Sequence, residues 1–342
     1  MNDEREQLST SDIAMLQDAT ECARRLEREI GKVIVGQRAV VRAMLTSVFA
    51  QGHTLLIGVP GLAKTLLVRT LAQTLGWSFR RIQFTPDMMP SDIIGMELLH
   101  DDPQTGRREM RFMQGPVFTN LLLADEINRT PPKTQSALLE AMQELTVTSL
   151  GKTHVLERPF LVFATQNPIE QEGTYPLPEA QLDRFMFSLW LDYPTRAEEE
   201  TIVSATTLDL VPSVESVLSH ERAQSFQRLV RRMPASQHVV SHAVAIARAT
   251  RPRDKDAAAC ARQYVEWGAG PRASQHMVLA AKALAVLDGR PAVSASDIRE
   301  AAPLVLRHRV LPNYTAAGDG LNANDIVRRI LDEVPEPSYA TV

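Results

Sequence analysis

The chain has 342 residues, of which 44% are apolar and 23% charged, and its formal net charge of −4 excludes a protein that grips nucleic acid over its whole surface. Its length predicts two globular domains, and no apolar run approaches the roughly 20 residues that span a bilayer. The charged start lacks the apolar stretch of a signal peptide, and Cys22 and Cys260 are too few for a disulfide framework or a metal cluster, so we expect a cytoplasmic protein with no membrane span.

The first 193 residues alternate between helical and strand patterns. Apolar residues recur every three or four positions from Ile13 to Ile30, which predicts an amphipathic helix, and a second helix is expected over residues 37–50. Short apolar runs predict five strands, over residues 54–57, 79–84, 121–124, 161–164 and 186–191. Strands of this kind, separated by helices, are typical of a parallel sheet covered on both faces. We therefore expect an α/β core over residues 1–193.

Two segments inside this core predict β-hairpins. Residues 97–115 contain the turn sequence Asp101-Asp102-Pro103-Gln104-Thr105-Gly106, and residues 146–156 alternate around Gly151. Such hairpins could contact another molecule or could be surface features without a binding role, and the sequence leaves both possibilities open.

A change of pattern follows Tyr193-Pro194-Thr195. The residue before a proline is pushed out of the helical region, and Thr195 can cap the next helix, so this segment predicts a hinge. Beyond it the strand patterns end, and helical patterns dominate at residues 221–233, 241–251, 273–287 and 296–305. We expect a smaller all-α domain over residues 195–333 and a flexible, proline-rich tail over residues 334–342.

The strongest functional signal lies between the first predicted strand and its helix: Gly58-Val59-Pro60-Gly61-Leu62-Ala63-Lys64-Thr65. A glycine-rich turn of this kind wraps backbone N–H groups around phosphate oxygens, and the helix N-terminus adds positive potential. Lys64 would reach the β- and γ-phosphates, and the Thr65 hydroxyl would bind Mg²⁺. We include Leu66 in this predicted nucleotide site. The usual pattern has glycine before the lysine, and Ala63 suits that position if its φ is negative.

Polar residues follow two other predicted strands. The run at 121–124 ends in Asp125 and Glu126, which would hold Mg²⁺ through water and polarise an attacking water, respectively. The run at 161–164 leads to Asn167, which could orient that water, although a turn asparagine before a proline has the same sequence. Because ligands bind at the carboxyl ends of parallel strands, these side chains should face the phosphates.

The order of these motifs, followed by Gln181-Leu182-Asp183-Arg184-Phe185, resembles the AAA+ ATPases. The full strings at residues 58–65, 124–129 and 164–168 resemble the MoxR branch of that class, for which alanine before the lysine is typical. The resemblance extends from about Val35 to Leu311. It implies that Lys64 and Thr65 are the Walker A pair, Asp125 and Glu126 the Walker B pair, and Asn167 the sensor asparagine.

Further roles rest on the resemblance alone. It implies that Arg184 is an arginine finger that reaches the ATP of the adjacent subunit. It implies that Arg272 is the sensor arginine of the helical lid, in contact with the γ-phosphate at the junction of core and lid. Val35-Gly36-Gln37 falls where the family lines its adenine pocket, and Arg129 matches a position near the subunit interface.

The function implied by the resemblance is Mg²⁺-dependent ATP hydrolysis by a homo-oligomeric ring, commonly a hexamer. Such a ring acts as a chaperone-like remodeller of a client protein, often with a von Willebrand factor A-type partner. Two alternatives remain open: a subunit that drives metal insertion into a chelate, and a nucleic-acid motor, for which only Arg107, Arg108 and Arg111 give a hint. A nucleotide-switched binding module without turnover is disfavoured, because Glu126 and Arg184 are both present.

Overall fold

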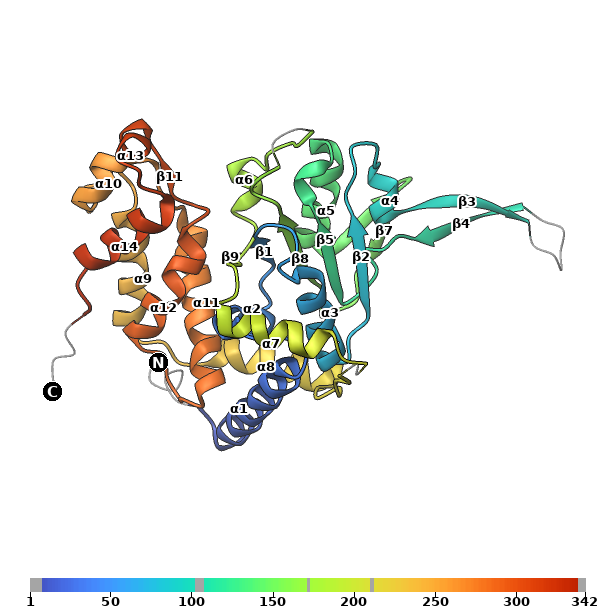
Figure 1. The fold of residues 1–342 in the computed structure, drawn as a ribbon, viewed down its shortest axis with the longest axis horizontal. Helices are drawn as coiled ribbons and strands as arrows, with labels where there is room; N and C mark the ends of the chain where they lie inside the picture. Colours follow the sequence, from blue (N-terminus) through green and yellow to red (C-terminus); the bar gives the residue numbers. More distant parts are fainter. Residues whose placement is uncertain (1–7, 102–107, 171–172, 210–211, 338–342) are drawn as a thin grey trace.

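The computed structural model describes residues 8–101, 108–170, 173–209 and 212–337, and its centre is a five-stranded parallel sheet (Figure 1). The sheet has the order β2-β5-β8-β1-β9. Its strands are β1 (Thr54–Ile57), β2 (Phe79–Gln83), β5 (Leu121–Asp125), β8 (Leu161–Gln166) and β9 (Phe187–Trp190). The predicted α/β core is confirmed, and each strand lies within two residues of its predicted bounds.

Helices cover both faces of this sheet. Successive strand residues point to opposite faces, so Leu56 and Phe163 join one apolar cluster while Leu55 and Val162 join the other. The first cluster is completed by α1 (Thr10–Gly31), α2 (Arg38–Phe49) and α3 (Lys64–Leu75), and the second by α5 (Pro132–Glu144). Shorter elements of the core are α4 (Pro90–Ile94), the 3₁₀ helix η2 (Ile127–Arg129) and α6 (Glu179–Leu182).

Both predicted hairpins are present. Strands β3 (Gly95–Asp101) and β4 (Arg108–Gln114) form an arm that projects from the core on the side away from the C-terminal helices (Figure 1), while residues 102–107 lie outside the described part of the chain. Strands β6 (Thr146–Ser149) and β7 (Lys152–Val155) form the second hairpin. The two hairpins meet where Phe112 stacks on His154, with ring centroids 3.8 Å apart, and where Lys152 pairs with Glu97 at 3.2 Å.

The C-terminal half is a helical lid built around α11 (Pro271–Asp288). Its other helices are α9 (Gln237–Ala249), α10 (Ala259–Tyr264), α12 (Ala295–Leu306), α13 (Tyr314–Gly318) and α14 (Ala323–Glu333). The prediction that strands end with the core is wrong in one place, where β10 (Val265–Trp267) pairs antiparallel with β11 (Leu311–Pro312). These strands have three and two residues and keep Trp267 and Leu311 exposed, so they carry no alternating apolar pattern that the sequence could show.

The lid and the core share one apolar cluster. Helix α7 (Arg196–Thr206) follows the predicted hinge, and α8 (His220–Arg232) then packs on α1 and α2, where Phe226 stacks on Phe49 at 5.9 Å. Both cysteines are buried and free. The tail predicted to be flexible is described as far as residue 337, and there Arg299 of α12 donates a 2.9 Å hydrogen bond to the carbonyl of Val334. None of the described helices is long and apolar enough to cross a membrane.

Candidate active site

The loop between β1 and α3 is shaped for an anion. Helix α3 begins at Lys64 without a side-chain cap, so its first N–H groups remain open to a ligand. Gly61 has a φ of 86° and Ala63 a φ of 55°. The condition under which alanine would suit this position, a negative φ, is therefore not met: the chain turns sharply into α3, and Ala63 adopts a left-handed conformation that costs on the order of 1 kcal/mol.

Lys64 folds back on this loop. Its Nζ donates hydrogen bonds to the carbonyls of Gly58, at 2.6 Å, and Val59, at 2.8 Å. Burial lowers the pKa of the ammonium, and the nearby carboxylates Asp125 and Glu126 oppose that shift. The ammonium thus rests on two neutral carbonyls, which are weaker partners than phosphate oxygens.

Asp125 ends β5, and both of its carboxylate oxygens are occupied. Thr165 on the neighbouring β8 donates its hydroxyl to Oδ1 at 2.6 Å. Arg81 on the other neighbour, β2, donates to Oδ2 from Nε at 2.9 Å and from Nη2 at 2.6 Å. The carboxylate predicted to serve Mg²⁺ is therefore paired with a guanidinium from its own chain.

Glu126 has a φ of 56° and lies just beyond the strand. Its N–H donates to the Thr165 hydroxyl at 2.9 Å, while its Oε2 accepts from Nε2 of Gln83 at 2.9 Å and lies 3.1 Å from Nε of Arg129. Arg129 also binds Glu170 in a fork, at 3.0 and 2.6 Å. The residue predicted to polarise water is thus held in a polar network that the sequence did not reveal.

Asn167 follows β8 and completes the same hollow, a cavity of about 500 Å³ that also contains Lys64, Thr65, Asp125 and Glu126. The pKa of the nearby Glu170 carboxyl is lowered chiefly by its hydrogen bonds with Arg129, with the smallest contribution from the Asn167 amide. Nevertheless, the buried Nδ2 of Asn167 has no acceptor within hydrogen-bond geometry among the described residues. An unused donor beside open helix N–H groups fits an anionic ligand.

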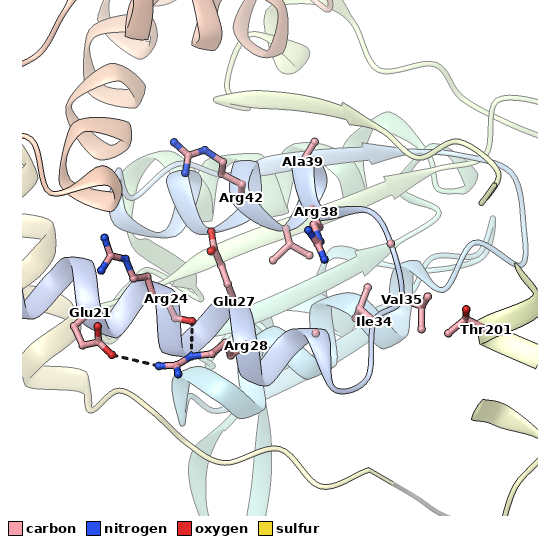
Figure 2. A pocket seen from close by; sticks show the side chains of 13 residues that line it. Glu21, Arg24, Glu27, Arg28, Ile34, Val35, Arg38, Ala39, Arg42 and Thr201 are labelled. Carbon is pink, nitrogen blue, oxygen red and sulfur yellow. Dashed lines mark hydrogen bonds and ion pairs between the residues drawn. The ribbon is translucent and has the colours of Figure 1, made fainter. Parts of the chain in front are cut away.

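The residues predicted to hold adenine do not line the cavity that contains the phosphate loop. Val35 and Gly36 line a separate and larger cavity of about 1100 Å³, between α1 and α2, with Thr201 of α7 at one end (Figure 2). Gln37, with a φ of 52°, immediately precedes α2 and does not line that cavity. Size alone does not make the larger hollow the reaction site, because the phosphate loop and both acids line the smaller one.

Arg184 and Arg272 lie at the opposite edge of the sheet from the phosphate loop. Parallel pairing puts Phe187, the first residue of β9, level with Thr54, the first residue of β1, whereas the phosphate loop follows the last residue of β1. The turn 183–186, which contains Arg184, is thus one strand length from that loop, about 13 Å. Arg272, at the start of α11, binds Asp183 in this turn at 3.1 Å. Arg272 is therefore held at the edge of the sheet away from the phosphate loop of its own chain, and its contact with a γ-phosphate stays a prediction.

Comparisons with known proteins identify the family of this chain. The family model described as "ATPase family associated with various cellular activities (AAA)" matches residues 53–187, and that of the "AAA lid domain" matches residues 257–330. The chain is 43% identical to Chaperone MoxR1 of Mycobacterium tuberculosis over 92% of this chain and 82% of that relative. It is 33% identical to Protein MoxR of Methylorubrum extorquens, over 95% of this chain and 98% of that one. This chain belongs to the MoxR family of AAA+ ATPases.

A solved structure supports the same fold for the MoxR-family chain. An ATPase candidate from Cytophaga hutchinsonii superposes with a TM-score of 0.85 at 38% identity, covering 95% of this chain and 98% of that one. The α/β core followed by a helical lid is therefore the fold of this protein.

Sequence reasoning missed several residues of the MoxR-family site. Arg81 and Gln83 lie on a half-exposed strand and carry no motif, and Thr165 directly follows the apolar run at 161–164. The order of the strands could have revealed them. Because β2 and β8 lie beside β5, polar side chains at their carboxyl ends lie close to Asp125 and Glu126.

The Arg81–Asp125 pair leads to a prediction. Arg81→Met should lower the Mg²⁺ concentration needed for half-maximal nucleotide binding about two- to fivefold, because a competing cation leaves the carboxylate. The shift corresponds to only ~0.5–1 kcal/mol, because the Arg81 side chain is 41% exposed and its ion pair is screened by solvent. A Mg²⁺ titration of nucleotide binding measures the shift. Arg80→Met, which removes an exposed arginine from the same strand, is the control; an unchanged Mg²⁺ requirement in Arg81→Met would contradict the competition.

Proposed function

We propose that this protein hydrolyses ATP with Mg²⁺ at sites shared between adjacent chains of a homo-oligomeric ring, a hexamer by family resemblance. The observation that carries the proposal is the division of the charged residues between two edges of one sheet. The phosphate loop, the acids and Asn167 meet at the carboxyl edge, whereas Arg184 and Arg272 meet at the other. A site that needs both sets requires a second chain.

The residues at the carboxyl edge fit MgATP. The open N-terminus of α3 and the unused Nδ2 of Asn167 offer donors to phosphate oxygens. The Thr65 hydroxyl and the Asp125 carboxylate are the hard oxygen ligands that Mg²⁺ takes. When bound, MgATP supplies the phosphoryl group and a divalent charge beside it.

Each of the site residues then has a defined role. Lys64 would exchange the carbonyls of Gly58 and Val59 for the β- and γ-phosphate oxygens, and Asp125, once released by Arg81, would be a ligand for the metal ion. Glu126 must leave the amide of Gln83 before it can take a proton from the attacking water. Asn167 orients that water. The bound nucleotide therefore replaces contacts that the chain makes with itself.

Arg184 and Arg272 act on the neighbouring chain. A guanidinium carries a permanent charge and planar donors that match the oxygens of a transferring phosphoryl group. Arg184 lies in the turn that Arg272 contacts through Asp183, so both would enter the neighbour's site together. Arg272 is thus reassigned from the lid's contact with its own nucleotide to a contact in trans.

Exposed apolar residues support a role as a cytoplasmic, chaperone-like remodeller of protein clients. The arm β3–β4 exposes Met96, Leu98, Leu99, Met110 and Met113, and flexible methionines adapt to varied apolar surfaces. One relative is named Chaperone MoxR1, which supports a chaperone-like role. The client is a protein, with a von Willebrand factor A-type partner implied by the family, rather than a nucleic acid.

Lys64→Ala tests the nucleotide site. Removing the ammonium from the phosphate loop should abolish detectable ATP binding in a calorimetric titration, because its charge acts on the β- and γ-phosphates in a half-buried site. Lys152→Ala is the matched control, since it removes an exposed lysine from the second hairpin. ATP affinity equal to that of the parent in Lys64→Ala would rule out this loop as the site.

A further inference from the structure

Arg309, which follows α12 in the lid, holds the turn that precedes β9. Its guanidinium is 2% exposed, and its Nε donates to Oδ1 of Asp183 at 2.7 Å. Nη2 donates to the carbonyls of Asp183 and Phe185, both at 2.7 Å, and Nη1 donates to the carbonyl of Met186 at 3.3 Å. These four acceptors belong to the turn 183–186, and Nη1 also donates to the carbonyl of Val305 in α12, at 2.6 Å. One lid side chain therefore fixes the backbone of a core segment.

The charge of Arg309 is balanced within the same cluster. A buried guanidinium is costly unless it is paired and hydrogen-bonded, and Asp183 supplies the carboxylate. Burial lowers the pKa of Arg309 to about 10, so it stays charged at neutral pH. Burial and Arg309 together lower the pKa of His276 to about 3, which leaves its Nδ1 neutral and able to accept from Nη2 at 2.9 Å. Within the cluster, Asp183 is therefore the carboxylate that balances the buried charge of Arg309.

Two further arginines depend on this turn. Oδ2 of Asp183 binds Nη1 of Arg272 at 3.1 Å, so one carboxylate joins both lid arginines. Arg184 stands between Asp183 and Phe185, the two residues whose carbonyls Arg309 holds. The Arg184 side chain itself makes no hydrogen bond or ion pair with any residue that the structure describes. Arg309 thus holds the backbone on either side of Arg184, while the Arg184 guanidinium stays available to a ligand.

We propose that Arg309 is a positioning residue, which acts through Asp183 and the turn 183–186 to hold Arg184 and Arg272 as one unit for the nucleotide of the adjacent chain. The inference rests on the proposed function, because these two arginines gain a target only when a second chain presents its phosphate site. Reactive groups lose about 10²-fold in rate when displaced by 1 Å, so the support of such a unit affects the rate directly.

The defect of an Arg309 variant should therefore appear in the neighbour. Arg309→Met should leave ATP affinity and KM unchanged and lower kcat roughly 10- to 100-fold. Mixed after subunit exchange with an equal amount of Lys64→Ala, whose arginines are intact but whose phosphate site is dead, it should regain activity. For random head-to-tail mixing, about a quarter of the sites combine an intact phosphate loop with an intact donor, so about a quarter of the parental rate is expected. A role confined to folding would not be rescued in this way.

Two more variants sharpen the test. Arg299→Met is the control, because Arg299 also donates to two backbone carbonyls in the lid, at 2.9 and 2.8 Å, yet lies outside the turn; its kcat should match the parent. Arg309→Lys keeps the charge beside Asp183 but cannot span four acceptors, so it should retain a kcat defect that Lys64→Ala rescues. It provides the measurement if Arg309→Met shows no cooperative thermal transition.

The outcomes separate the inference from the proposed function. Parental kcat in Arg309→Met, or in Arg309→Lys where it serves as the replacement, overturns the inference. So does a defect that Lys64→Ala fails to rescue while a mixture of Arg184→Ala and Lys64→Ala recovers activity. If that second mixture also stays inactive although mixed rings form, the proposed shared site is lost, and the inference falls with it.

Discussion

An Arg184→Ala chain should bind ATP as tightly as the parent and hydrolyse it roughly 10³–10⁵-fold more slowly, the usual effect of an arginine finger. Binding should survive because Arg184 lies at the edge of the sheet opposite to the phosphate loop of its own chain. Hydrolysis should fail because the guanidinium is needed where negative charge redistributes in the neighbour's site. Calorimetric titration and phosphate release measure the two quantities separately.

Mixing variants shows whether Arg184 acts on its own chain or on the next one. Lys64→Ala chains keep the finger and lack the site, whereas Arg184→Ala chains keep the site and lack the finger. An equimolar mixture should release phosphate at a rate that neither variant reaches alone, and the rate should rise with total protein concentration as rings assemble. A mixture that gives only the sum of its parts, in rings known to contain both chains, would place the finger elsewhere.

Glu126→Gln has the second largest expected effect. The variant should retain ATP and Mg²⁺ binding and turn over roughly 10²–10⁴-fold more slowly, the usual contribution of a positioned base. The amide has the same shape as the carboxylate and can still accept from Gln83, but it cannot take a proton from water. Glu170→Gln, at the outer end of the Arg129 pair, is the matched control and should change turnover far less. Turnover near the parental rate in Glu126→Gln would mean that another group activates the water.

Local patterns in the sequence are enough to predict the parallel sheet and half of the site residues. Strands β5 and β8 are buried on both faces, so they appear as short apolar runs, and the residues that end them fall at the carboxyl edge by topology alone. For this reason Lys64, Asp125, Glu126 and Asn167 are brought together as predicted. The positive φ of Ala63 escaped prediction because it is set by the sharp turn into α3 and not by the residue's own preference.

The remaining half of the site depends on distant contacts. Arg309 and Asp183 are 126 positions apart in the sequence, and nothing in the neighbourhood of either residue indicates the other. Arg272 and Asp183 are likewise 89 positions apart, so the placement of Arg272 could not be predicted either. Arg81 was missed because an arginine on an exposed strand is more commonly a solvated surface residue.

The separation of the two charged groups along the sheet also restricts symmetry. A two-fold dimer places the same patch of both chains in one contact, and here that patch would have to include opposite edges of a sheet. The proposed contact between a phosphate loop and the arginines of the next chain would therefore be heterologous and have a direction. Repeated, such a contact either closes on itself or grows into an open helix, and an open assembly always ends in one chain whose nucleotide no arginine reaches. Only a closed ring would give every nucleotide the arginines of a neighbouring chain, which is a functional reason for the assembly to be circular.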